Sequence, residues 1–148
     1  MRIDDVPHVV AIANSLEEAP HWHPGTYLGA LTSDAIPARI LLVAEDAVDG
    51  IVGFVVTALI PPQAELESIA VAKFAQRRGI ARRLFAELIA ALKKSEILEV
   101  ILEVRESNRS ARALYASLGF VETGRRTGYY SEPKEDAILL SRSNLLTG

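Results

Sequence analysis

The sequence predicts an α+β fold in which one mixed sheet carries helices on its faces, an α/β-type three-layer arrangement. Short runs rich in Val, Ile and Leu, bounded by turn residues, indicate strands. Longer segments with apolar residues one helical turn apart indicate amphipathic helices. A chain of 148 residues can form one domain with a real core, and no internal repeat or low-complexity tract interrupts it. We therefore expect a single domain over residues 1–148.

The N-terminal segment is expected to be mainly helical. Residues 1–3 are read as the stub of a first strand. Asp5 then caps a helix, with Pro7 in its first turn, where a missing N–H does no harm. A loop bracketed by two prolines leads to a short helix at residues 26–31. The buried stripe of the first helix is expected to consist of Val6, Val9, Val10, Ala13 and Leu16.

The strands follow from apolar runs and turn signals. Asp49-Gly50 indicates a hairpin turn between two such runs. The run at residues 97–105 is nearly continuous in Leu, Ile and Val, which suits a central strand covered on both faces. A polar loop that includes Tyr129 and Tyr130 is expected between the last two strands. The expected strands are residues 40–45, 51–60, 63–71, 97–105, 120–126 and 137–142.

Two further helices are predicted. One begins at Ile80, and the other begins after Asn108, which can cap it, and stops at Gly119. Each has an apolar stripe at helical spacing. The stripes are Ile80, Leu84, Leu88 and Leu92 in the first helix, and Ala111, Leu114, Tyr115 and Leu118 in the second.

Composition excludes several classes of function. A formal net charge of −3 argues against nonspecific nucleic-acid binding, which favours a basic surface. The absence of cysteine excludes disulfides, thiolate metal sites and a cysteine nucleophile. The apolar runs are too short to span a bilayer, and the N-terminus lacks the layout of a signal peptide. We expect a cytoplasmic protein with no membrane or nucleic-acid partner.

The segment from Ser68 to Arg83 has the features of an anion site. An apolar run ends at Val71, a loop follows, and a helix begins just after Gly79. The first turn of a helix has free N–H groups and a partial positive charge, and a glycine lets another molecule approach the backbone. Four arginines surround this helix end: Arg77, Arg78, Arg82 and Arg83. A pyrophosphate is the most plausible ligand, although arginines on a helix surface are often merely solvated.

The same residues carry a resemblance to a known family. The stretch 76–81, Gln-Arg-Arg-Gly-Ile-Ala, resembles the acetyl-CoA pyrophosphate loop of the GNAT superfamily of N-acetyltransferases. The wording LEVRESN at 102–108, followed by ALYASLGF at 113–120 and by Tyr129-Tyr130, is most similar to the RimI-type ribosomal-protein alanine N-acetyltransferases. The resemblance is dense from about residue 68 to residue 142. It implies the GNAT fold, with a mostly antiparallel sheet and helices on both faces.

The resemblance also implies acetyl-CoA as cosubstrate and assigns its contacts. The backbone of Ile69, Ala70 and Val71 would lie along the pantetheine arm. Asn108 would contact the CoA arm as well as cap its helix, and Tyr115 would protonate the departing thiolate. By residue type alone, Tyr115 is a core residue whose hydroxyl reaches a polar edge. The expected cofactor-binding set is Ile69, Ala70, Val71, Arg77, Arg78, Gly79, Ile80, Ala81, Arg82, Asn108 and Tyr115.

Glu103 is the candidate general base. Strand alternation places it on one face with Glu99 and Arg105, and a carboxylate in so apolar a strand is costly unless it is paired or used. From the residues alone, a salt bridge or exposure at the strand end is equally open. The RimI-type resemblance implies that this position carries the base. Glu65 and Glu67 are rival bases, or else members of cross-strand ion pairs.

The acceptor side matches the family least. Trp22, Tyr129 and Tyr130 are expected to line the acceptor groove. His21 and His23 flank Trp22, but no carboxylate is spaced to complete a metal site, so we expect none. The acidic residues Glu17, Glu18 and Glu132 are candidates for contacting an arginine-rich peptide, or simply solvated charges.

The predicted function is direct transfer of acetyl from acetyl-CoA to a primary amine, most plausibly the N-terminal alanine of a small-subunit ribosomal protein. One alternative is acetylation of a small amine such as a polyamine, aminoglycoside or amino acid. Another is a noncatalytic acyl-CoA-binding module, against which the presence of Glu103 and Tyr115 counts. The sequence leaves the oligomeric state open between monomer and homodimer.

Overall fold

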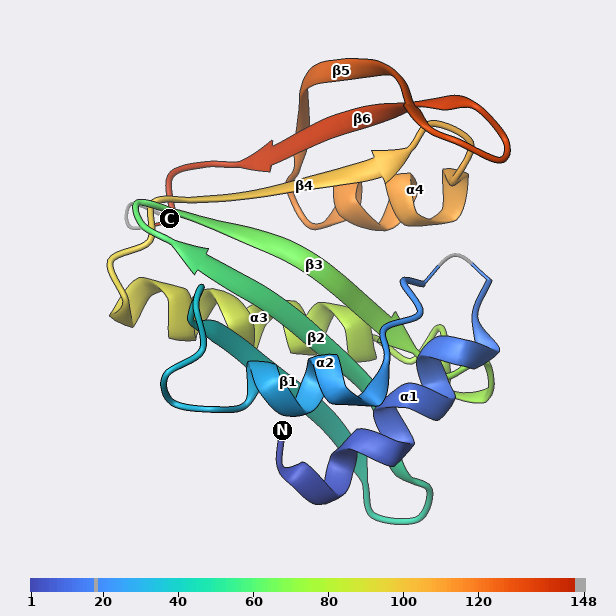
Figure 1. Cartoon of the computed structure of the whole chain (residues 1–148), viewed down its shortest axis with the longest axis vertical. Helices are drawn as coiled ribbons and strands as arrows, with labels where there is room; N and C mark the ends of the chain where they lie inside the picture. The colour runs from blue at the N-terminus through green and yellow to red at the C-terminus, as the bar shows by residue number, and fades with distance from the viewer. Residues whose placement is uncertain (18, 146–148) are drawn as a thin grey trace.

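The computed structural model describes residues 1–17 and 19–145, so Glu18 lies outside the described residues. Within them, six strands form one mixed sheet in the order β1-β2-β3-β4-β6-β5 (Figure 1). All neighbouring strands are antiparallel except β3 and β4, which are parallel. The strands are β1 Arg39–Asp46, β2 Gly50–Ile60, β3 Gln63–Val71, β4 Glu99–Arg105, β5 Val121–Tyr130 and β6 Glu135–Arg142.

Helices lie on both faces of this sheet. One face carries α3 and α4, whose apolar side chains share a core with the strands, and the other carries α1 and α2 (Figure 1). None of the described helices is long and apolar enough to cross a membrane. The α-helices are α1 Val6–Ser15, α2 Pro24–Ala30, α3 Ile80–Lys94 and α4 Arg109–Ser117, with short 3-10 helices η1 Ile3–Asp5 and η2 Lys73–Ala75.

The two helical layers cover unequal parts of the sheet. The core under α3 and α4 includes residues of β2, β3, β4 and β6. The core under α1 and α2 includes residues of β1, β2 and β3 but none of the described residues of β4. Because α1 and α2 stop at β3, the same face of β4 is not packed under a helix of that layer.

The strands β3 and β4 pair only near their starts. Their parallel ladder consists of three residue pairs and ends at Glu65 and Ile101. Beyond this point the two strands diverge (Figure 1). Opposite β2, the pairing of β3 skips Glu67, which is the extra residue of a β-bulge. The edge of β3 that faces β4 is therefore not paired with β4 beyond Glu65.

The central-strand prediction needs a correction. The segment 97–105 was expected to be covered on both faces, but β4 alternates, with Val100, Leu102 and Val104 buried and the intervening side chains only half-buried. The strand buried on both faces is β2. The reason is the extent of α1 and α2, which pack over β2 and do not reach β4. The alternation itself agrees with the predicted placement of Glu103.

The N-terminus also differs from the prediction. Residues 1–3 do not form a strand, and residues 3–5 form the 3-10 helix η1. The terminal ammonium of Met1 donates to the carbonyl oxygen of Leu41 at 2.9 Å, so a single hydrogen bond ties this end to β1. Asp5 occupies the cap position of α1, but its carboxylate accepts from the N–H of Arg2 at 2.7 Å instead.

Smaller differences concern side-chain placement and strand length. In α1, Ile12 is buried, whereas Val10, which was expected in the buried stripe, is only half-buried. Tyr129 and Tyr130 end β5 and do not lie in the loop, because β5 and β6 form a longer hairpin. The predicted α+β fold with helices on both faces of a mixed sheet is confirmed.

Candidate active site

The loop between β3 and α3 is shaped by its backbone. Arg77 and Gly79 both have left-handed backbone angles, with φ of 65° and 78°. Gly79 is the N-cap of α3, and no side chain caps this helix end. The N–H groups of the first turn, which point away from the helix, are thus not used by a side-chain cap at Gly79.

Two hydrogen bonds from side chains to backbone carbonyl groups stabilise this loop. The Gln76 amide donates to the carbonyl oxygen of Val71 at 3.0 Å, and the Arg78 guanidinium donates to that of Phe74 at 3.2 Å. A Cβ built on Gly79 would meet no atom within 4 Å, so the space beside it is open and only its positive φ demands glycine. Arg77, Arg78, Arg82 and Arg83 are exposed around this opening. The loop thus combines a rigid backbone, an uncapped helix end and a rim of cations.

The end of β3 is paired with β2 along one edge and is not paired with β4 along the other. Ile69, Ala70 and Val71 pair with β2 through Val55, Phe54 and Gly53. Their other edge lies beyond the end of the β3–β4 ladder. Ser68 adds a buried hydroxyl on this stretch, 5% exposed, whose oxygen has no hydrogen-bond partner among the described residues. A buried polar atom without a partner fits a site where a polar ligand binds. The sequence analysis did not assign Ser68 to the site.

The start of α4 is capped as predicted. The Asn108 Oδ1 accepts from the N–H of Ala111 at 3.1 Å and from the Ser110 hydroxyl at 3.3 Å. The side-chain amide nitrogen of Asn108 is not used by this cap. Further along α4, the ring of Tyr115 packs against Phe120 with centroids 5.7 Å apart.

Tyr115 is a weak acid in this environment. Burial, and secondarily the neighbouring Tyr130, raise the pKa of the Tyr115 phenol to about 12. The phenol therefore keeps its proton throughout the physiological range. The influence of Tyr130 also indicates that these two side chains, from α4 and β5, lie close to each other.

Three carboxylates lie on the sheet face opposite α3 and α4. Glu65 and Glu67 come from β3 and Glu103 from β4, since Glu65 shares its face with Ile101 in the ladder and Ile101 with Glu103. Burial, followed by the charges of Glu67 and Glu103, raises the pKa of Glu65. The divergence of β3 and β4 thus begins beside a negatively charged cluster.

Two arginines pair with this cluster. Arg39 of β1 binds Glu67 with two hydrogen bonds, of 2.7 Å from Nε and 3.2 Å from Nη2, and its guanidinium lies 5.8 Å from the ring centre of Trp22. Arg126 of β5 approaches Glu103 with Nε at 3.2 Å. Sequence analysis missed both arginines because each ion pair joins different strands and leaves no local pattern. The predicted cross-strand ion pair is confirmed for Glu67.

The aromatic residues at the end of β5 extend the same cluster. The Arg126 guanidinium lies 5.3 Å from the ring centre of Tyr129, and the Arg105 guanidinium lies 4.2 Å from that of Tyr130. Burial, followed by the negative charge of Glu103, raises the pKa of Tyr130. Ion pairs and ring contacts therefore link Trp22 to Glu67 and Glu103 to Tyr129, and charge interactions with Glu65 connect the two groups. Glu17 and Glu132 are exposed and take no part in it.

The histidines flanking Trp22 have structural contacts. The His21 Nε2 lies 2.8 Å from the carbonyl oxygen of Leu16, and the His23 Nδ1 accepts from the N–H of Gly25 at 3.2 Å and caps α2. Among residues 1–17 and 19–145, no group of His, Asp and Glu is arranged to hold a metal ion.

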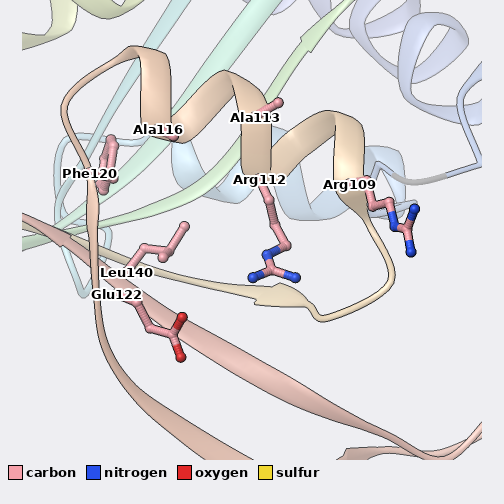
Figure 2. A pocket seen from close by; sticks show the side chains of 7 residues that line it. All are labelled: Arg109, Arg112, Ala113, Ala116, Phe120, Glu122 and Leu140. Carbon is pink, nitrogen blue, oxygen red and sulfur yellow. The ribbon is translucent and has the colours of Figure 1, made fainter.

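A separate hollow lies away from these residues. It has a volume of about 400 Å³ and opens between α4 and the β5–β6 hairpin (Figure 2). Its polar lining consists of Arg109, Arg112 and Glu122, and none of the predicted site residues contributes to it. Leu140 in its wall belongs to the core under α3 and α4, so the hollow is on the other face of the sheet from Glu103.

Comparisons with known proteins agree with this geometry. Residues 10–120 match the Acetyltransferase (GNAT) family. The chain is 40% identical to the ribosomal protein bS18-alanine N-acetyltransferase of Salmonella typhimurium over 139 residues, which cover 93% of this chain and 90% of that enzyme. The crystal structure of the ribosomal-protein-S18-alanine N-acetyltransferase from Escherichia coli is similar, with a TM-score of 0.81 and 30% identity, covering 100% of this chain and 93% of that one.

Part of the chain is also similar to a solved structure that contains acetyl coenzyme A. This structure is of a Bacillus anthracis protein in complex with acetyl coenzyme A, and the match has a TM-score of 0.66 and 27% identity over 71% of this chain and 62% of that one. The predictions of a GNAT resemblance and of an N-acetyltransferase are confirmed by these matches. The chain belongs to the acetyltransferase (GNAT) family, whose members use acetyl-CoA.

Proposed function

We propose that this protein transfers acetyl from acetyl-CoA to the N-terminal alanine of a small-subunit ribosomal protein. The relative that is 40% identical over 93% of the chain bears the name of that activity. The observation that carries the proposal is that Tyr130 lies within electrostatic range of both Glu103 and Tyr115, and that Glu103 comes just after the end of the β3–β4 ladder. One carboxylate and one protonated phenol at a single place suit an acid–base reaction.

The cofactor side rests on backbone groups. The first-turn N–H groups of Ile80, Ala81 and Arg82 would bind the diphosphate, with Arg77 and Arg78 supplying positive charge. The strand edge at Ile69, Ala70 and Val71 would pair with the amides of the pantetheine arm. The Asn108 amide nitrogen, which its cap does not use, would donate to the same arm. The unpartnered hydroxyl of Ser68 supports binding of a polar group here.

The reaction joins a nitrogen to the acetyl carbon and breaks its bond to sulfur. An N-terminal amine has a pKa of about 7.7–8.0, so it needs only modest help to lose a proton. Glu103 accepts that proton, directly or through a water, and Tyr115 faces the sulfur. Because a thiol has a pKa of about 8.5 and burial raises that of Tyr115 to about 12, Tyr115 acts mainly by donating a hydrogen bond to the developing thiolate.

The three carboxylates are not equivalent candidates for the base. Glu67 is committed to Arg39 by two hydrogen bonds, which weakens its case. Glu65 has a raised pKa, which suits a base near neutral pH, but the carboxylate on β3 or β4 whose charge acts on Tyr130 is Glu103. We therefore assign the base to Glu103 and keep Glu65 as the alternative. Trp22, Tyr129 and Tyr130 would line the path of the peptide.

A panel assay of thiol release from acetyl-CoA tests the proposal. The acceptors are an alanine-initiated ribosomal peptide, the same peptide with a blocked N-terminus, and a set of polyamines, aminoglycosides and amino acids. We expect release with the free peptide alone. Equal rates with the free and blocked peptides, or faster release with a small amine, would contradict it.

A further inference from the structure

Two arginine–glutamate pairs flank the candidate acceptor site, and they differ in how firmly they are held. The Arg39–Glu67 pair has two hydrogen bonds, and its side chains are only 19% and 18% exposed. In the other pair, Arg126 touches Glu103 through Nε at 3.2 Å, and its side chain is 55% exposed. A bidentate, shielded pair is a fixed part of a site, whereas an exposed single contact contributes little and exchanges readily.

We propose that Arg126 is an exchangeable counter-ion of the acceptor site: it neutralises Glu103 in the free enzyme, and the cationic amine of the acceptor takes its place. This inference rests on the proposed function. It makes Arg126 a positioning and specificity residue that is not part of the reaction itself. When the acceptor binds, its ammonium group thus replaces the Arg126 guanidinium beside the Glu103 carboxylate.

The charges around Glu103 fit this exchange. Glu65 and Glu67 of β3 lie on the same face, and Arg39 of β1 is committed to Glu67. Arg105 of β4 is occupied by Glu135 of β6, at 2.9 Å, and by the ring of Tyr130. Among the described residues, Arg126 is thus the cation paired with Glu103. With Arg126 displaced, the uncompensated negative charge of the cluster favours an ammonium over a neutral molecule.

The ring of Tyr129 offers a second position for the Arg126 guanidinium. This guanidinium lies 5.3 Å from the ring centre of Tyr129, and that ring is half exposed to solvent. A guanidinium can rest on an aromatic face while its charge is shared with water. Since Arg126 is on the exposed β5 edge of the sheet, its long side chain can leave Glu103 without movement of the backbone.

Replacement by Arg126→Gln tests the exchange, with Arg126→Lys as the variant that retains the charge. The matched control is Arg125→Gln. Arg125 precedes Arg126 in β5, so its side chain points to the opposite face, where it pairs with Glu106 and Asp136. The initial rates of all four proteins are measured with the alanine-initiated peptide between pH 5.5 and 9, together with their melting temperatures.

In Arg126→Gln we expect the KM for the cationic peptide to fall about two- to fivefold, the scale of an exposed ion pair. The value of kcat should stay within about twofold, because Arg126 has already left Glu103 in the complex. The acid limb of kcat/KM should move to higher pH, because the positive charge of Arg126 lowers the pKa of nearby Glu65 and its removal makes this carboxylate easier to protonate. Arg126→Lys should restore both values, and Arg125→Gln should change neither.

The outcomes separate this inference from the proposed function. If the unmodified enzyme does not acetylate the peptide, the proposed function fails. If it does, but Arg126→Gln raises the peptide KM or leaves both KM and the pH profile unchanged, only the exchange is wrong. A purely structural role for Arg126 would lower the melting temperature and kcat together and would not move the acid limb.

Discussion

The cofactor side and the acceptor side of this enzyme are built in different ways. The cofactor side is one continuous segment, from the end of β3 to the first turn of α3, and its geometry depends on main-chain angles at Arg77 and Gly79. The acceptor side is a set of side chains from different strands, joined by ion pairs and ring contacts between β1, β3, β4 and β5. In the proposed function, backbone groups bind a ligand common to a whole family, while side chains that can change one at a time determine which amine is used.

The two sides meet where the sheet separates. The β3–β4 ladder stops at Glu65 and Ile101, so β3 has an edge not paired with β4 beside the proposed cofactor site, and β4 carries Glu103 beside the proposed acceptor site. The comparison predicts large catalytic effects from single side chains at this point. Substitutions in the loop between β3 and α3 should have smaller effects, mainly on cofactor binding. Substitutions where β3 and β4 are paired should affect stability alone.

The largest effect is expected for Glu103→Gln. Loss of a general base typically costs about 10²–10⁴ in rate, so kcat with the alanine-initiated peptide should fall at least 100-fold. Glu65→Gln should cost less than tenfold. Steady-state kinetics of both variants check this. A greater loss in Glu65→Gln would transfer the role of base from β4 to β3.

Tyr115→Phe should reduce kcat about 10- to 100-fold, the scale of one hydrogen bond to a charged group, while the affinity for acetyl-CoA stays near that of the unmodified enzyme. The hydroxyl is lost but the ring that packs on Phe120 remains, so folding should not suffer. Calorimetric titration with CoA and initial-rate kinetics separate the two quantities. Tyr27→Phe is the control and should retain kcat, because Tyr27 is buried in the core under α1 and α2 and its hydroxyl has no hydrogen-bond partner among the described residues. Equal turnover in Tyr115→Phe and the unmodified enzyme would remove this phenol from the mechanism.

Gly79→Val should weaken acetyl-CoA binding about tenfold or more, because a left-handed conformation costs a non-glycine residue about 1–2 kcal/mol. Gly50→Val is the matched control: Gly50 has φ of 75°, close to the 78° of Gly79, and both positions are open. Both variants should lose stability, and only Gly79→Val should lose affinity in a CoA titration. Similar affinities in the two would mean that the loop backbone does not bind the cofactor.

The smallest effect is expected at Glu99, where β3 and β4 are still paired. The Glu99 carboxylate accepts from Ser141, Gln63 and Ser143, and these hydrogen bonds lower its pKa below the usual 4.5. A carboxylate with a lowered pKa stabilises the fold above its unfolded pKa and loses that effect as the pH falls through the folded value. Glu99→Gln should therefore reduce the free energy of unfolding by about 1–2 kcal/mol at pH 7 and much less at pH 3.

Urea denaturation at the two pH values measures this difference. The surface control is Glu87→Gln, a replacement on the exposed face of α3 that should change neither value. An equal loss of stability for Glu99→Gln at pH 7 and pH 3 would show that the hydrogen bonds act without the charge. Activity of the folded variant should change little, since Glu99 lies at the start of the ladder and away from Glu103.

The cofactor side was the more predictable of the two. Gln63–Val71 and the start of α3 at Ile80 were found from local patterns, because strand alternation, a glycine and a helical stripe lie next to one another in the chain. The cap at Asn108 was found for the same reason. An ion pair was left open for both Glu103 and Glu67, but their partners Arg126 and Arg39 were not found, because they lie far apart in the chain and nothing local indicates that the sheet will bring them together.

The sequence by itself determined most strands and helices, the loop before α3 and the family, since these depend on periodicity and on residues adjacent in the chain. Only the tertiary structure decided which strand is buried on both faces, where β3 and β4 separate, and which cation stands beside which carboxylate. Those features depend on strand order and on how far α1 and α2 extend over the sheet. The physical reason is that burial and ion pairing are properties of contacts between distant segments, and a local pattern carries no record of them.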